Sequence, residues 1–221
     1  MKKILITTLL IIGSIHTFCQ LNGSGNVINK TYDYSGFDKV YFNDLHGEIT
    51  IEIGKPFSIS ISIDDNLESL LNLSENKTEH ELIISLKGNE RNKMYIENTN
   101  IKINITMPES SVVKNNGNSS LNISNILGRY FKLENNGNGG TKMTGTIDKL
   151  DIIKRGNGSV VANKLIAKTS EINSAGNGNI LVNVSGDITV QLAGNGDVQN
   201  SGSGRFIVKG KINGNGKLIS N

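Results

Sequence analysis

The stretch ENNGNGGTKMTGTIDKLDIIKRGNGSVV, from Glu134 to Val161, decides the fold. It contains two copies of the tripeptide Gly-Asn-Gly, separated by a segment in which apolar and polar residues alternate. Such alternation places successive side chains on opposite faces of a β-strand. Glycine and asparagine enter the left-handed region of backbone conformation more readily than most residues, so the tripeptide predicts a corner between strands.

The same tripeptide recurs every 18 to 20 residues along the C-terminal half of the chain. A unit of this length cannot bury an apolar face alone, so the units must stack and share a core. Stacking would also bring successive corner asparagines about 4.8 Å apart, where their side-chain amides can form a hydrogen-bonded ladder. We therefore interpret the corner residues as structural. They are Gly137, Asn138, Gly139, Gly156, Asn157, Gly158, Gly176, Asn177, Gly178, Gly194, Asn195, Gly196, Gly214, Asn215 and Gly216.

These observations predict an all-β protein, a right-handed parallel β-helix or β-solenoid with rungs of about 20 residues. We expect one continuous domain, with regular repeats over residues 115–221 and less regular β-rich rungs, or a cap, over residues 20–114. A single helical turn capped by Asp65 is expected in that first part. Its candidate strands are Lys39–Phe42, Ile49–Ile53, Phe57–Ile63, Glu81–Leu86 and Asn100–Met107.

The composition of the 221-residue chain excludes several other classes of protein. One cysteine excludes a disulfide scaffold, two prolines exclude collagen, and 25 glycines disfavour a long helical bundle. The 23 basic and 20 acidic side chains nearly balance, unlike the strongly basic charge of nucleic-acid-binding proteins. We therefore expect no nucleic-acid partner. We also expect no transmembrane segment.

The first 19 residues predict a secretory signal peptide. Two lysines precede an apolar run from Ile4 to Ile12, and Thr17 and Cys19 stand where a signal peptidase requires small residues. The mature chain would then begin at Gln20. The alternative is a lipoprotein acylated at Cys19. In either case we expect an exported protein, located in the periplasm, on the cell surface or outside the cell.

Several short segments carry a family resemblance. They are the sequences GSGNV from Gly23, ITIEIG from Ile49 and DNL from Asp65, the strand from Ile103 to Pro108, and the repeated corners. In these features the chain resembles the "putative auto-transporter adhesin, head GIN domain" family of secreted Bacteroidetes-type proteins. It uses Asn-Gly-Asn-Gly where that family commonly has Ser-Gly-Ser-Gly. The resemblance implies a β-helical fold, an envelope or secreted location and an adhesive function, and it brings no catalytic residues.

We expect no metal, cofactor or catalytic site. After residue 19 the sequence holds two histidines, His46 and His80, and no cysteine, which are too few nitrogen and sulfur ligands for a zinc site. Calcium at Asp197 would need carboxylates in the equivalent positions of neighbouring repeats, where Ser159 and Asn179 stand. Neither a nucleophile elbow nor a phosphate-binding loop is present.

An alternative is a glycan-active β-helix enzyme, a hydrolase or lyase, which would need two carboxylates across a groove. We interpret the acidic residues of the regular half as occupying different columns of the repeat, so that stacking does not bring them together. On this basis we expect a non-enzymatic protein. The residues in question are Glu134, Asp148, Asp151, Glu171, Asp187 and Asp197.

Two sets of side chains are candidates for binding glycans or envelope and surface proteins. Aromatic residues gather near the mature N-terminus, and Tyr32, Tyr34 and Phe37 are the candidate site; packing in the core is the alternative. Basic residues of the repeat half could form a stripe that attracts acidic glycans, or could simply confer solubility. They are Lys132, Lys142, Lys154, Arg155, Lys209 and Lys211.

The segment Leu218–Asn221 lies inside an incomplete repeat, which would leave a strand edge exposed. We expect either an end-to-end homo-oligomer or coverage of this edge by the N-terminal stretch. Taken together, these patterns favour an exported adhesin or a binding and scaffold module of the cell envelope. An envelope protein that binds no ligand is a further alternative.

Overall fold

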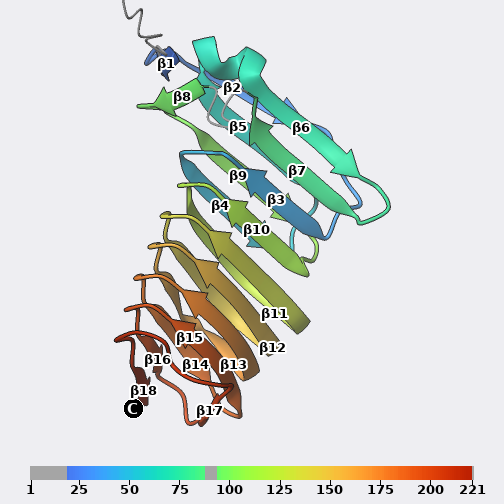
Figure 1. Cartoon of the computed structure of the whole chain (residues 1–221). Coiled ribbons are helices and arrows are strands. Elements are labelled where there is room, and N and C mark those ends of the chain that lie inside the picture. The colour runs from blue at the N-terminus through green and yellow to red at the C-terminus, as the bar shows by residue number, and fades with distance from the viewer. Residues whose placement is uncertain (1–18, 88–93, 221) are drawn as a thin grey trace, which may run out of the picture.

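The computed structural model describes residues 19–87 and 94–220. The chain is all-β, with 63% of its residues in strands and 3% in helix, as the sequence predicts. Figure 1 shows the strands side by side along one axis, from β6 and β7 at one end to β17 and β18 at the other. The signal peptide predicted for residues 1–19 lies outside the described residues, except for Cys19.

The N-terminal half consists of short strands and one 3-10 helix, η1. The five candidate strands correspond to β3, β4, β5, β7 and β9. The elements are β1 (Cys19–Asn22), β2 (Val27–Tyr32), β3 (Lys39–Asn43), β4 (Glu48–Ile53), β5 (Ser58–Asp64), η1 (Asp65–Leu70), β6 (Leu71–Asn76), β7 (Glu81–Leu86), β8 (Met94–Glu97) and β9 (Lys102–Met107).

The C-terminal half contains three long strands, β11 to β13, of 17, 15 and 16 residues, each of which runs through the whole segment between two corners. Its elements are β10 (Val112–Asn116), β11 (Ser120–Asn136), β12 (Thr141–Arg155), β13 (Val160–Ala175), β14 (Ile180–Val184), β15 (Ile188–Ala193), β16 (Val198–Asn200), β17 (Phe206–Val208) and β18 (Leu218–Ser220).

Sixteen strands join in one sheet, and β1 pairs with β8 in a second. Along the C-terminal half the pairing is parallel, and partner residues lie one repeat apart, as for Leu121 and Thr141 or Leu133 and Ile152. Register shifts divide β11, β12 and β13 into first and second parts. The first parts continue the series β9, β4 toward β14, β16 and β18. The second parts continue the series β7, β3, β10 toward β15 and β17.

The order of the N-terminal strands in space differs from their order in the chain. Strand β3 lies between β7 and β10, and β4 lies between β9 and β11. Residues 39–53 therefore lie directly beside β10 and the first part of β11, although residues 54–111 separate them from β10 in the sequence. This insertion is why the sequence shows no period in this half.

Antiparallel strands complete the N-terminal end. Strand β2 pairs with β5, β5 with β9, and β6 with β7. The helical turn η1 follows β5 directly, but the predicted cap is wrong, because Asp64 rather than Asp65 occupies the N-cap position. Asp64 makes no side-chain cap bond. Its carboxylate instead accepts hydrogen bonds from Gly25 and Asn100.

Buried isoleucine, leucine and valine side chains fill the interior from end to end. Alternation along each strand turns one residue in two inward, and the parallel register stacks equivalent residues. Leu133, Ile152, Ile172 and Val190 form one such row, and none is more than 1% exposed. Burial of each such side chain contributes about 1.5–3 kcal/mol, so the shared core stabilises every layer that contributes to it.

Each corner needs glycine because the backbones of successive corners approach closely. Gly176 has a φ of 118°, and a Cβ atom there would lie 2.2 Å from the carbonyl oxygen of Gly156. Among the described residues other than glycine, a positive φ occurs at Asp44, His80, Asn98 and Asn125. The corner asparagines therefore do not adopt the left-handed conformation for which their residue type is suited.

The corner asparagines are instead joined through their side chains. The Nδ2 atom of Asn157 donates to Oδ1 of Asn138 over 3.0 Å, and Nδ2 of Asn177 donates to Oδ1 of Asn157 over 2.9 Å. The same bond continues the column from Asn118 to Asn215. The amide ladder that the spacing predicts is thus present along one edge of the molecule.

The N-terminal stretch does not cover the last layer. Strands β17 and β18 pair with β15 and β16, and the N-terminal elements lie at the other end of the stack (Figure 1). The expectation that this stretch covers the C-terminal edge is therefore wrong. The alternative, an end-to-end oligomer, stays a prediction.

Candidate binding face

One outward surface of the sheet is almost continuously polar and is here called the charged face. It is formed by β7, β3, β10, the second parts of β11 to β13, and β15. Its residues alternate with the buried core residues of the same strands, so the parallel register sets them in straight rows. One row runs across seven strands. It consists of Glu81, Lys39, Val112, Lys132, Asp151, Glu171 and Thr189.

Tyr130 lies at the centre of the repeat part of this face. The residue is 40% exposed, and its hydroxyl donates to Oδ2 of Asp151 over 2.9 Å. The Lys149 ammonium lies 5.8 Å from the ring centroid, within the range of a cation–π contact. A cavity of about 190 Å³ beside the ring is lined by Lys132, Glu171 and others. An exposed aromatic ring thus stands beside an acid and a cation.

Ion pairs link the charges around Tyr130 into a network. Lys149 Nζ lies 3.3 Å from Asp151 and 3.9 Å from Glu171. Lys209 Nζ lies 3.0 Å from the other oxygen of Glu171, and Lys132 pairs with Glu134. Each exposed pair contributes little alone, but together they hold long side chains in defined positions.

The protonation of these groups suits binding better than acid catalysis. The hydrogen bond and charge of Lys209 lower the pKa of Glu171, so this carboxyl is ionised near neutral pH. Burial, and then the hydrogen bond to Asp151, raise the pKa of Tyr130 to about 12, so the phenol keeps its proton. Asn173 adds an amide that donates to Gln191 over 3.2 Å. Ring, acids and amides are the groups that contact hydroxyl-rich ligands.

The expected separation of the carboxylates is wrong for two of them. Asp151 and Glu171 are direct partners on the neighbouring strands β12 and β13, and both contact Lys149. Each stands five residues before the first glycine of the next corner, as does Lys132. That shared offset was the signal in the sequence that could have found them.

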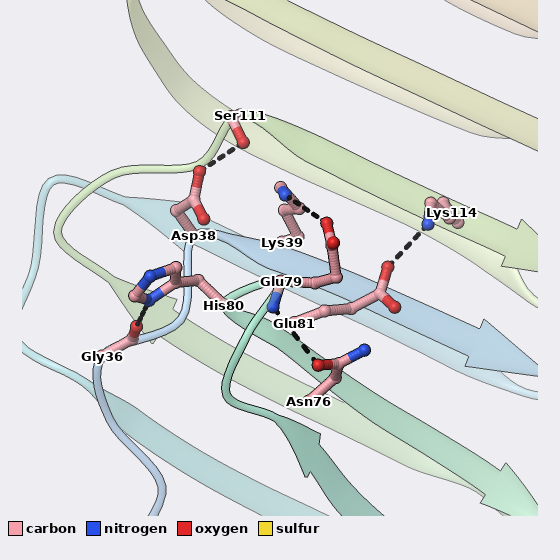
Figure 2. Close-up of polar contacts among 9 residues, drawn as sticks. All are labelled: Gly36, Asp38, Lys39, Asn76, Glu79, His80, Glu81, Ser111 and Lys114. Atoms are coloured by element: carbon pink, nitrogen blue, oxygen red, sulfur yellow. Dashed lines mark hydrogen bonds and ion pairs between the residues drawn. The ribbon is translucent and has the colours of Figure 1, made fainter.

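The other end of the charged face carries the polar contacts drawn in Figure 2. Lys114 on β10 lies 2.7 Å from Glu81 on β7. Its ammonium also lies 5.7 Å from the ring centroid of Tyr41. Lys39 pairs with Glu79 over 3.3 Å, at the turn that leads into β7. The two parts of the face therefore share one arrangement, a tyrosine ring beside a lysine that pairs with an acidic side chain.

His80 belongs to the same turn, and its ring contacts a backbone carbonyl oxygen rather than a carboxylate. Its Nδ1 atom lies 3.2 Å from the carbonyl oxygen of Gly36, as Figure 2 shows. Across the described ranges, no group of three histidine, cysteine or acidic side chains is placed to hold a metal ion.

The aromatic cluster singled out in the sequence does not form an open surface. Phe37 is 1% exposed, and its ring centroid lies 4.9 Å from that of Phe57. Tyr32 and Tyr34 are half-buried against the core, and the Tyr34 hydroxyl lies 3.4 Å from the Leu73 carbonyl oxygen. Phe37 is therefore out of reach of a ligand. Tyr130, which was not singled out, is exposed because its neighbour Phe131 turns inward.

The proposed basic stripe is also absent from the structure. The side chain of Lys154 is fully buried, and Lys132 and Lys209 are each paired with a glutamate. Positive and negative charges are mixed on the charged face, where lysines pair with acids on the same or a neighbouring strand. A purely electrostatic attraction of acidic polymers to this face is not supported.

The chain is similar to a known family and to several solved structures. A family model described as "Putative auto-transporter adhesin, head GIN domain" matches residues 36–204. The solved structure of a "putative adhesin" from Bacteroides fragilis aligns with 91% of this chain and 100% of its own, at 20% identity and a TM-score of 0.66. That of a "Putative lipid binding protein" from Parabacteroides distasonis aligns with 91% and 99%, at 18% identity and a TM-score of 0.52. At these identities the likeness concerns the fold.

The comparison with curated proteins gives no match. The helix η1, six residues long, is too short to cross a membrane, and the described part of the chain has no helix that could.

Proposed function

The chain belongs to the "Putative auto-transporter adhesin, head GIN domain" family, and from this premise we propose that it is an exported, non-enzymatic adhesin. Its binding surface would be the charged face around Tyr130. The scaffold would be a right-handed parallel β-solenoid, regular over residues 115–221 and irregular over residues 20–114. The glycines and asparagines of its corners would have a purely structural role.

The observation that carries this proposal is the exposed Tyr130 ring, held between Lys149 and Asp151 on a surface of paired strands. Side chains on a paired sheet are held more rigidly than side chains on loops, so little conformational entropy is lost when a ligand binds. An extended polar surface with an aromatic anchor suits a hydroxyl-rich or protein ligand at the envelope.

A glycan-active enzyme is less well supported by the same residues. Asp151 and Glu171 are neighbours, as such an enzyme requires, but both are already paired with Lys149. A glycosidase also needs one carboxylic acid whose pKa is raised enough to donate a proton. The pKa of Glu171 is lowered instead.

The decisive experiment is protease treatment of intact cells that produce the protein, with a periplasmic protein as the control. Loss of the chain while the control survives is the expected result, because an adhesin must be outside the cell. Protection of the chain until the outer membrane is opened would overturn the adhesin proposal. In that case a binding or scaffold role within the periplasm would take its place.

Lipid binding is a second candidate function, favoured by two exposed apolar side chains. Leu127 is 74% exposed and Ile166 is 54% exposed, and both are partners of Thr146 in the register of β11, β12 and β13. Liposome flotation separates the two functions. Leu127→Ser should abolish flotation if lipid is the ligand, whereas Tyr130→Ser should reduce adhesion and leave flotation unchanged.

A further inference from the structure

A second hollow lies away from the charged face, on the outward side of β4 and the first parts of β11 and β12. Its volume is about 380 Å³, at the lower end of the range for small-molecule sites. Its lining is mixed. Ile49, Leu121 and Val161 are apolar, and the carboxylate of Glu48 is paired with Lys102 over 3.3 Å. The other lining residues include Gly140 and the polar residues Thr50, Ser120, Asn122, Lys142 and Ser159.

Gly140 opens this hollow, and nothing in the backbone requires a glycine there. Its φ is not in the left-handed region, and a Cβ atom would meet only the carbonyl oxygen of Ser159, at an ordinary 3.6 Å. The neighbouring corner glycine, Gly139, is different, since a Cβ atom there would lie 1.9 Å from the Ser119 carbonyl oxygen. The missing side chain at position 140 therefore leaves space without serving the corner.

Gly140 also interrupts a chain of hydrogen bonds that the next repeats maintain. At the equivalent position of each later repeat, a side-chain oxygen accepts from the backbone N–H one repeat further on. Ser159 accepts from Asn179 over 3.2 Å, Asn179 from Asp197 over 2.9 Å, and Asp197 from Lys217 over 2.8 Å. Gly140 has no side chain to offer the N–H of Ser159. An oxygen atom of a ligand in the hollow could take that place.

Three further polar side chains beside the hollow are available to a ligand. Thr50, Asn122 and Lys142 are successive partners across β4, β11 and β12. Their side chains make no hydrogen bond or ion pair to any residue that the structure describes. On the charged face, by contrast, most of the lysines are paired with acids. The polar side chains of this row are therefore available to bind a ligand.

We propose that this hollow binds one acidic sugar unit, of the uronic acid type. Its carboxylate would lie between the ammonium of Lys142 and the N–H of Ser159. Its hydroxyls would reach the amide of Asn122 and the hydroxyl of Thr50, and the C–H side of the ring would pack on Val161. The inference names a ligand class for the proposed adhesin and rests on that function for its biological meaning.

The test is a titration of the purified 15N-labelled protein, followed by NMR, with glucuronate, glucose and acetate as probes. Glucuronate should shift the amide signals of Ser159 and Lys142 and reach saturation. Glucose lacks the carboxylate and acetate lacks the ring, so each should bind at least roughly tenfold more weakly. An unmoved Ser159 signal with glucuronate, or equal binding of acetate, would overturn the proposal.

Two variants localise the binding. Gly140→Asn should fill the hollow and supply the missing acceptor, as Asn179 does in its own repeat, so it should fold normally and lose binding at least roughly tenfold. Lys142→Gln should also lose binding, whereas Lys164→Gln, an exposed lysine on β13 outside the hollow, should not. Unchanged binding by Gly140→Asn would place the ligand elsewhere. Because these measurements need no cells, their failure would leave the protease result intact.

Discussion

The Nζ atom of Lys154 donates a hydrogen bond to the carbonyl oxygen of Gly156 over 3.1 Å, on the inward side of a corner. The Lys154 side chain is fully buried, in a row between Asn135 and Ser174. No carboxylate of the described segments pairs with it. Burial lowers the pKa of Lys154, because an ammonium ion loses its hydration there and gains one carbonyl in return.

Replacing Lys154 by methionine should therefore stabilise the protein. Methionine has a similar unbranched shape and no charge to desolvate, so it can fill the same space. We expect the free energy of unfolding to rise by about 1–4 kcal/mol near pH 7, measured by urea denaturation. A loss of stability in Lys154→Met would show that the ammonium is bound more favourably than its contacts indicate.

The difference in stability between the wild type and Lys154→Met should depend on pH. The pKa of Lys154 is lower in the folded protein than its ordinary 10.5, so between these two values the unfolded chain binds more protons. The stability of the wild type should then rise as the pH increases toward 10.5, and the gap to Lys154→Met should narrow. A gap that stays constant over this range would contradict the assigned pKa direction.

The asparagine ladder should contribute stability in proportion to the bonds each member makes. Asn157 makes two ladder bonds, to Asn138 and from Asn177, so Asn157→Ala should cost about 1–2 kcal/mol. Asn215, the last member, makes one bond, to Asn195 over 3.2 Å, and its alanine variant should cost about half as much. Urea unfolding of both variants checks the ratio. Equal costs would indicate that ladder bonds do not determine the effect.

Substitution by alanine should have opposite effects on stability at two glycines, Gly176 and Gly140. Gly176→Ala should cost at least about 3 kcal/mol, because its φ of 118° is strained for alanine and the new Cβ would lie 2.2 Å from a backbone oxygen. Gly140→Ala should be neutral or stabilising by about 0.4–1 kcal/mol, since its backbone suits alanine and the unfolded chain loses freedom. The midpoints of urea unfolding measure both changes in stability, provided that the unfolding free energy of each variant depends equally steeply on urea concentration. A large loss at position 140 would contradict the inference that its glycine is not structural.

The repeat half could be predicted well from the sequence because its register depends on local features. Each corner needs glycine, each strand alternates, and both recur at nearly constant spacing, so Leu133 must lie beside Ile152. The pairing of Asp151 with Glu171 was equally available from their common offset. What the pattern could not show is Lys154, because a lysine in an inward row contradicts the rule that inward residues are apolar.

The N-terminal half could be predicted only as a set of strands. Placing β3 beside β10 depends on the packing of side chains that are distant in the sequence, and no spacing encodes it. The exposed site residue Tyr130 shows the opposite case. Its outward direction follows from the inward Phe131, but a search for clustered aromatics passes over a single tyrosine.

The last prediction concerns Asp64, which joins the antiparallel strands of the N-terminal end. Its buried carboxylate accepts from the Gly25 N–H over 2.9 Å, and from the Asn100 N–H and side-chain amide over 2.6 and 3.0 Å. Burial alone would raise the pKa of Asp64, but these hydrogen bonds outweigh it and lower the pKa below 3.8. Asp64→Asn has a single acceptor oxygen for three donors, so it should cost about 2–3 kcal/mol near pH 7.

The pH dependence of this cost distinguishes the charge of Asp64 from its shape. Because the folded pKa is the lower one, the stability from this carboxylate is complete above about pH 4 and is lost as the pH falls through the folded value. The gap between the wild type and Asp64→Asn should therefore shrink in acid. Asp65→Asn is the matched control, since Asp65 is exposed and its side chain accepts from the Ser24 hydroxyl, and it should cost less than about 0.5 kcal/mol. If the Asp64→Asn gap stays the same in acid, the charge on the carboxylate is not what these donors stabilise.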